Sequence, residues 1–181
     1  MPAPDPEFFR RCKHWKVRPT VQVFTVSVAR QRAQLWKRGA SANSRYALVR
    51  DYVVSTSRFG IGQQEGSNRT PIGLHRVSQK IGGDLPEGAV FVSRKHIGFT
   101  WDGHPDAAIA HRILWLEGLE TGLNRGGTVD TFKRYIYIHG VGDESTLGKP
   151  ASRGCVHLAA KDLIPLYARL RVGTLVWISE N

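Results

Sequence analysis

The chain has 181 residues, of which 41% are hydrophobic and 23% charged, a composition that allows one buried core and excludes wholesale disorder. No apolar run approaches the roughly 20 residues that a membrane-spanning helix needs. The net charge of +11 attracts polyanions in general, but the basic residues are scattered and form no known nucleic-acid-binding motif. A nucleic-acid-binding domain would rest on charge alone, so we expect no specific nucleic-acid partner.

The N-terminal residues 1–19 are rich in proline and basic side chains and predict an extended arm. The following residues, 20–181, are expected to form one domain. The chain lacks the basic stretch and apolar segment of a secretion signal at its start, which leaves a cytoplasmic protein or a removed signal as alternatives.

The remaining elements are mostly strands. β-branched residues, alternating patterns and short apolar runs predict them. They are expected at residues 21–28, 31–37, 46–57, 74–77, 111–116, 134–138 and 174–178, with shorter apolar runs at 90–92 and 97–99. Long glycine-rich loops separate several of them, and only residues 159–170 have convincing helical spacing. The sequence therefore predicts a mostly β fold with one main C-terminal helix and long loops.

The two cysteines, Cys12 and Cys155, do not form a Cys-x-x-Cys pair, so a structural zinc site is not expected. A disulfide between them is possible in an oxidising compartment. The histidines show no metal-binding spacing either. We therefore expect neither a metal nor a cofactor.

One segment combines residues that could carry nucleophilic chemistry. His139 follows a predicted core strand, and Cys155 follows a glycine that favours a sharp turn. A nucleophilic cysteine needs a nearby base and backbone N–H groups that can hold an oxyanion. An adjacent imidazole could lower the pKa of the thiol by forming an ion pair. On spacing alone, Cys155 could equally be a buried apolar residue and His139 an ordinary strand-end histidine.

The pattern Ile138-His139-Gly140, eleven further residues and Ser152-x-Gly154-Cys155-Val156 resembles the signature of the L,D-transpeptidase catalytic (YkuD) domain family. Thr70-Pro71-x-Gly73 and the stretch at 147–151 are also similar to segments of that family. The resemblance covers roughly residues 20–179. It implies a β-sandwich-like YkuD fold.

The resemblance implies a peptidoglycan L,D-transpeptidase that forms 3→3 cross-links. Cysteine attacks the tetrapeptide donor stem before its terminal D-alanine, and an amine of a neighbouring stem resolves the thioester. Carried over to this chain, Cys155 is the nucleophile and His139 the base. The Gly140 carbonyl orients the imidazole, and the backbone N–H groups of Arg153, Gly154 and Cys155 form the oxyanion hole. Substrate contacts are expected from four residues: Tyr137, Ser152, Arg153 and His157.

This chain departs from the family at His157, where arginine is usual, and the sequence does not decide what His157 does instead. Two alternatives remain for the function. An L,D-carboxypeptidase would resolve the same thioester with water, and a non-catalytic module would only bind the cell wall. The family implies a cell-envelope or periplasmic location, peptidoglycan stem peptides as partners and carbapenem adducts at Cys155. We expect a monomer.

Overall fold

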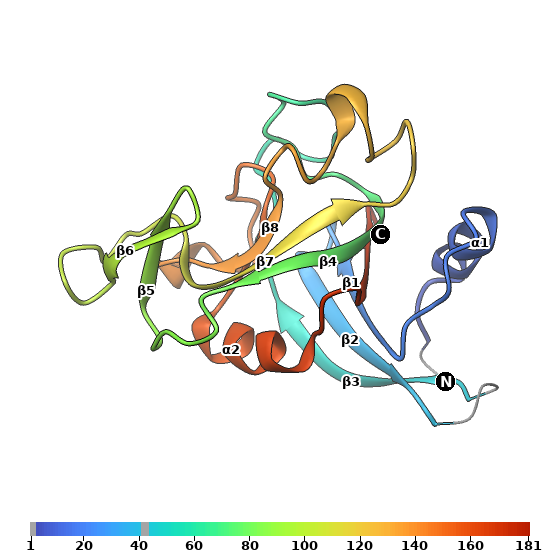
Figure 1. Ribbon diagram of the computed structural model, residues 1–181, viewed down its shortest axis with the longest axis horizontal. Coiled ribbons are helices and arrows are strands. Elements are labelled where there is room, and N and C mark those ends of the chain that lie inside the picture. Colours follow the sequence, from blue (N-terminus) through green and yellow to red (C-terminus); the bar gives the residue numbers. More distant parts are fainter. Residues whose placement is uncertain (1–2, 41–43) are drawn as a thin grey trace.

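The computed structural model describes residues 3–40 and 44–181. Ten strands join in one mixed sheet, and two helices and two short 3-10 turns lie outside it (Figure 1). The strands are β1 Gln22–Ser27, β2 Arg32–Arg38, β3 Tyr46–Val53, β4 Gly73–Ile81, β5 Ala89–Val92, β6 Lys95–Phe99, β7 Ala110–Gly118, β8 Tyr137–Gly140, β9 Val156–Leu158 and β10 Leu175–Ser179. The fold is mostly β, as the sequence predicts.

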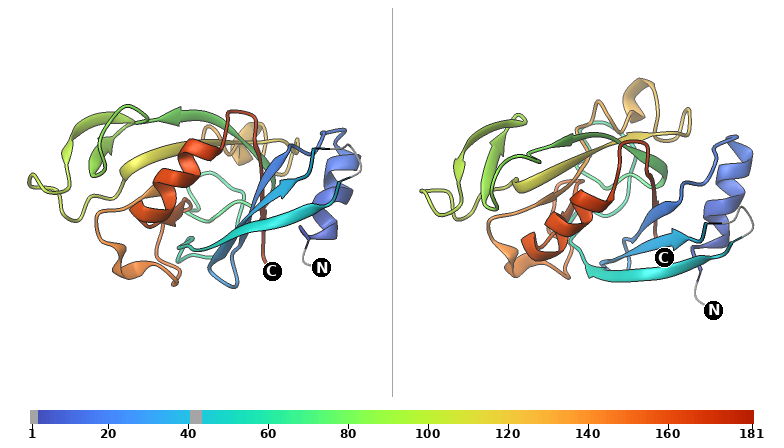
Figure 2. Two further views of the ribbon diagram at one scale, coloured as in Figure 1. Left: turned by 90° about the horizontal axis from the view of Figure 1, so that it is seen from below. Right: turned by 60° about the horizontal axis from the view of Figure 1, so that its bottom comes forward.

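The sheet runs in the order β3-β2-β1-β10-β4-β7-β5-β6, and β8 pairs with β7 and carries β9 on its other side. The pairs β1–β10 and β8–β9 are parallel, and the other pairs are antiparallel. The main core lies between the strands and helix α2, Ala160–Arg169, which packs on β7 and β8 (Figure 2). Lys80 fixes the end of α2, because its Nζ donates to the carbonyls of Tyr167 and Leu170 over 2.7 Å each.

The N-terminal segment differs from the extended arm that we predicted. It contains helix α1, Pro6–His14. Proline is tolerated at the start of a helix, where its missing N–H has no partner to lose. Phe8 and Cys12 are buried on one face of α1 and pack with Trp36 and Trp177 in a second apolar cluster. Figure 2 shows α1 at the end of the molecule opposite the β5–β6 hairpin. The N-terminal segment therefore contributes to a core.

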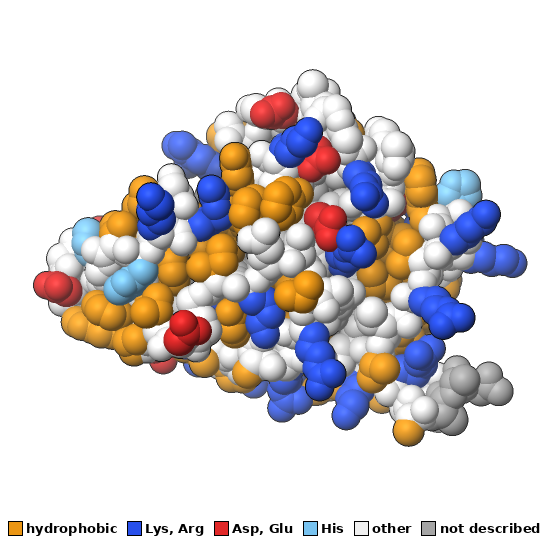
Figure 3. Space-filling model, in the orientation of Figure 1, with side chains coloured by type: hydrophobic (Ala, Val, Ile, Leu, Met, Phe, Trp, Pro, Cys, Tyr) orange, Lys and Arg blue, Asp and Glu red, His pale blue; other side chains and the backbone are white. Residues whose placement is uncertain are grey.

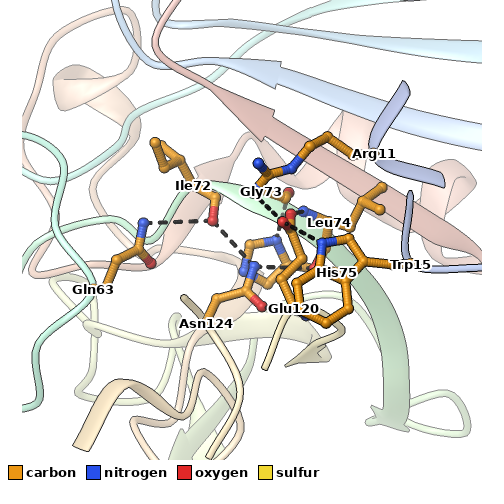
Figure 4. A network of polar contacts seen from close by, with 9 residues as sticks. All are labelled: Arg11, Trp15, Gln63, Ile72, Gly73, Leu74, His75, Glu120 and Asn124. Carbon is orange, nitrogen blue, oxygen red and sulfur yellow. Dashed lines mark hydrogen bonds and ion pairs between the residues drawn. The ribbon is translucent and has the colours of Figure 1, made fainter. Parts of the chain in front are cut away.

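A polar network ties α1 to the sheet (Figure 4). Arg11 pairs with the fully buried carboxylate of Glu120. The same carboxylate accepts hydrogen bonds from Trp15 Nε1 at 3.0 Å and from the Leu74 backbone N–H at 2.6 Å. The Asn124 side chain extends the network to the start of β4, donating to the carbonyls of Ile72 and Leu74. Every polar atom of the Glu120 carboxylate thus has a partner, as burial of a charge requires.

One of the predicted strands begins later in the structure than expected. The strand expected at 134–138 begins only at Tyr137, because Tyr135 has a left-handed φ of 56° that interrupts an extended backbone.

The surface shown in Figure 3 carries Lys and Arg side chains spread over the face with few acidic ones among them. The positive charge is thus dispersed on this face.

Candidate active site

Strands β8 and β9 bring the two candidate catalytic side chains to one place. The strands are parallel, and His139 is in register with His157, two residues after Cys155. Cys155 ends the turn that leads into β9. Both His139 and Cys155 line a single open cavity of about 440 Å³. The structure therefore brings together the residues that the sequence predicts as base and nucleophile.

The His139 ring is anchored by the residue that follows it. His139 is 2% exposed, and its Nδ1 lies 2.7 Å from the backbone carbonyl oxygen of Gly140. A carbonyl can only accept, so Nδ1 carries the hydrogen and Nε2 is left as an acceptor. Burial lowers the pKa of His139 to about 4, which keeps the ring neutral at pH 7. Nε2 can therefore take up a proton.

The Cys155 thiol lies in a pocket of backbone polar groups. The Tyr137 N–H donates to Sγ over 3.3 Å, and the thiol faces the Tyr135 carbonyl at 3.5 Å. Burial raises the pKa of Cys155 to about 11, although the Tyr137 hydrogen bond and the charge of Arg134 act in the opposite direction. The sequence-based expectation of a thiol ionised by its histidine thus differs from the structure. Burial favours the neutral form of both groups, so a nucleophilic attack by this thiol would require its proton to move.

The raised thiol pKa predicts the pH dependence of alkylation. In a Cys12→Ala protein, where Cys155 is the only thiol, the rate of reaction with iodoacetamide should rise by about tenfold per pH unit from pH 7 to 10, because only the thiolate reacts. The modified fraction is measured by intact mass. A rate that is already constant below pH 8 would instead show a preformed ion pair with His139.

The turn before Cys155 requires glycine. Gly154 has a φ of 119°, and a Cβ there would lie 3.2 Å from the Arg69 carbonyl oxygen and 3.1 Å from Ile136. The Ser152 hydroxyl closes the turn by donating to the Cys155 carbonyl over 2.6 Å and accepting from the Gly154 N–H over 3.2 Å. Ser152 is buried, so its contacts favour a role in holding the turn over direct contact with a substrate.

The other predicted substrate residues have different surroundings. Arg153 is exposed and lines the cavity. Tyr137 is 4% exposed, and its backbone N–H, not its ring, meets the sulfur. The His157 ring packs against His139 with centroids 4.6 Å apart. Burial and the neighbouring His139 lower the pKa of His157 to about 3, so His157 does not supply the positive charge of the arginine that it replaces.

Sequence reasoning missed two arginines beside this site. Arg134 donates to the carbonyls of Arg69 at 2.7 Å and Gly62 at 3.2 Å, and so holds the loop that packs on Gly154. Its charge also lowers the pKa of the Cys155 thiol. Arg94 lies on the tip of the β5–β6 hairpin and contacts the rings of Tyr135 and Trp115. The hairpin is distant from Cys155 in the chain, so no local pattern predicted either contact.

No group of three or more His, Cys, Asp or Glu side chains within residues 3–40 and 44–181 is arranged to hold a metal ion. No helix in this part of the chain is long and apolar enough to cross a membrane.

Comparison with known proteins identifies related folds. A family model described as the L,D-transpeptidase catalytic domain matches residues 21–178. No curated protein sequence matches significantly. Among solved structures, Bd1075 of Bdellovibrio bacteriovorus superposes with a TM-score of 0.58 at 12% identity, over 90% of this chain and 49% of that one.

Two further structures contain β-lactam compounds. L,D-transpeptidase 3 from Mycobacterium tuberculosis, with a faropenem-derived adduct, has a TM-score of 0.52 at 14% identity, over 88% of this chain and 60% of that one. The LD transpeptidase LdtMt1 in complex with imipenem has a TM-score of 0.52 at 15% identity, over 88% and 59%. The chain thus spans about half to three fifths of the length of these structures, and at such identities they show the fold alone.

Proposed function

The chain belongs to the L,D-transpeptidase catalytic domain family, and we propose that it is a cysteine acyltransferase that forms 3→3 cross-links between peptidoglycan stem peptides in the cell envelope. The observation that supports the proposal is the presence of Cys155 and His139 in the lining of one open cavity, where the Gly140 carbonyl holds the imidazole so that Nε2 can accept a proton. The start of the catalytic domain at residue 20 is a prediction from the sequence. Helix α1, which precedes that residue, packs on the sheet.

In the proposed first half-reaction, Cys155 Sγ attacks the carbonyl carbon before the terminal D-alanine of the donor, and its proton passes to His139 Nε2. The oxyanion is held by the backbone N–H groups of Arg153 and Cys155, and by that of Gly154 once Ser152 yields its bond. The carbon–nitrogen bond then breaks, and the D-alanine amine leaves with the proton from His139. A thioester on Cys155 remains.

In the second half-reaction, the amine of a neighbouring stem attacks the thioester carbon. His139 removes a proton from the attacking nitrogen and returns it to the departing sulfur, which restores both groups to the neutral forms that burial favours. By the same chemistry, opening of a carbapenem ring by Cys155 would leave a covalent adduct on the thiol. Such adducts are consistent with the compounds in the related structures.

The proposal is tested by mass spectrometry of products after incubation with a disaccharide-tetrapeptide. We expect a dimer with a 3→3 link and one released D-alanine for each bond formed. Release of D-alanine without dimer would instead indicate a carboxypeptidase, and an unchanged substrate would indicate a module without catalytic activity.

Substitutions of His157 and Arg153 should distinguish a residue that positions the base His139 from a residue that binds the substrate. His157→Ala removes the ring that packs on His139, so kcat should fall by about 10- to 100-fold with little change in KM, because small displacements of a base are costly. Arg153→Ala, an exposed residue of the same cavity, should raise KM and leave kcat nearly unchanged. Steady-state kinetics of the two variants decide this. A His157→Ala protein with wild-type kcat would exclude the positioning role.

A further inference from the structure

The β5–β6 hairpin carries an arginine at a backbone position that arginine rarely occupies. Val92 pairs with Lys95, so Ser93 and Arg94 form a two-residue turn. Both have left-handed φ angles, 47° and 67°, which asparagine and glycine usually supply in such turns. Strained residues of this kind tend to gather at functional sites. The hairpin projects from the end of the sheet in Figure 1. Its strand β5 pairs with β7 through one residue pair, Val90 and Ala110.

Two aromatic rings hold the Arg94 side chain in place. Its guanidinium carbon lies 4.8 Å from the ring centroid of Trp115 and 4.8 Å from that of Tyr135. Trp115 is fixed in turn by Phe132, which stacks on it at 4.0 Å and 5°. Cation–π contacts of this geometry keep the plane of a guanidinium in place without using its N–H groups.

Two of the residues that Arg94 contacts also contact the sulfur. The Tyr135 carbonyl and the Tyr137 N–H both face Cys155 Sγ. Arg94 contacts the Tyr135 ring and donates to the Tyr137 hydroxyl over 3.4 Å. Arg94 and the Cys155 thiol therefore share two neighbours, Tyr135 and Tyr137.

The charge of Arg94 has no acidic partner among the described residues. No ion pair or hydrogen bond other than that to Tyr137 is found for Arg94 in residues 3–40 and 44–181. A guanidinium has five N–H donors in a fork that matches a carboxylate. Four of these donors are thus available beside the site. Meanwhile His157, which replaces the arginine usual in the family, is half-buried against His139, and its lowered pKa favours the neutral ring.

We propose that Arg94 is a specificity-determining residue that binds the carboxylate of the donor's terminal D-alanine. This inference rests on the proposed function, because that carboxylate is two bonds beyond the amide nitrogen of the bond to be broken. A peptide whose scissile carbonyl meets Cys155 Sγ has this carboxylate one residue away from the sulfur, and Arg94 contacts Tyr135 and Tyr137, whose backbone groups face that sulfur. The aromatic layer holds the guanidinium in advance, so binding the carboxylate does not require ordering a flexible side chain.

The test compares a tetrapeptide stem with its C-terminal amide, which differs only in the charge at D-alanine. Binding of both is measured by calorimetry to a Cys155→Ala protein, so that no turnover occurs. We expect the acid to bind about tenfold more tightly than the amide, as a charge-assisted bidentate contact implies. Adding Arg94→Ala should bring this ratio close to one, and Arg94→Lys should leave an intermediate ratio.

The matched control is Lys95→Ala, which removes the neighbouring exposed charge of the same hairpin and should leave the ratio unchanged. If Arg94 only stabilises the hairpin, Arg94→Ala will weaken the binding of both peptides equally and preserve the ratio of their affinities. That result would overturn the proposal. Equal binding of acid and amide by the parent protein, including no binding of either, would also overturn it. Failure of the proposed function is distinct, because the protein with Cys155 would then form no thioester even if it discriminated between the peptides.

Discussion

Replacing Cys155 with alanine should lower the rate of D-alanine release by on the order of 10⁴- to 10⁶-fold, the loss found when a catalytic nucleophile is removed. The reason is that Cys155 supplies the sulfur that forms the acyl intermediate in the proposed mechanism, whereas the buried His139 serves as the base. The fold should be retained, because Cys155 contributes one small side chain at the edge of an apolar cluster. Release of D-alanine is followed by mass spectrometry, and the fold by circular dichroism.

Cys12→Ala is the matched control for this prediction. Cys12 is also a free cysteine, but it is buried on α1 in the separate apolar cluster, where burial raises its pKa to about 12. We expect wild-type turnover from Cys12→Ala. A Cys155→Ala protein that releases D-alanine at more than a few per cent of the wild-type rate would exclude Cys155 as the nucleophile.

Replacing Arg11 with alanine should lower the free energy of unfolding by about 3 kcal/mol, the cost of leaving one member of a buried ion pair without its partner. The Glu120 carboxylate is fully buried and Arg11 is 33% exposed. Trp15 and Leu74 would still donate to the carboxylate, but the opposite charge would be gone. The effect should appear in urea unfolding as a lower midpoint with an unchanged slope.

Arg10→Ala provides the control, because Arg10 precedes Arg11 on the same helix and its side chain is 72% exposed in a surface pair with Glu7. Such pairs contribute about 0–1 kcal/mol. Equal effects of the two substitutions would show that the Arg11–Glu120 pair does not anchor α1. A large effect of Arg11→Ala alone would place α1 within the folding unit of the catalytic domain.

The sequence predicted most strands because alternation and β-branching report local burial directly. It missed α1 because the prolines and basic residues around Phe8 and Cys12 obscure a short amphipathic face, and only packing on the sheet reveals it. It placed the start of β8 too early because the left-handed φ of Tyr135 depends on tertiary contacts.

At the site, the resemblance to the family indicated Cys155 and His139, and the structure places both in one cavity. It did not indicate their protonation. The sequence suggested an ion pair, whereas burial favours the neutral form of each group, and burial depends on the whole fold. The contacts of Arg94 and Arg134 depend equally on loops that meet only in three dimensions.

The mass of the intact protein after brief incubation with a tetrapeptide stem decides whether Cys155 forms the acyl thioester. The proposed mechanism predicts a mass increase equal to that of the peptide less one D-alanine, located on Cys155 by peptide mapping and removed by an added amine acceptor. An unmodified protein under conditions where the peptide binds, or an adduct on Cys12 alone, would contradict it.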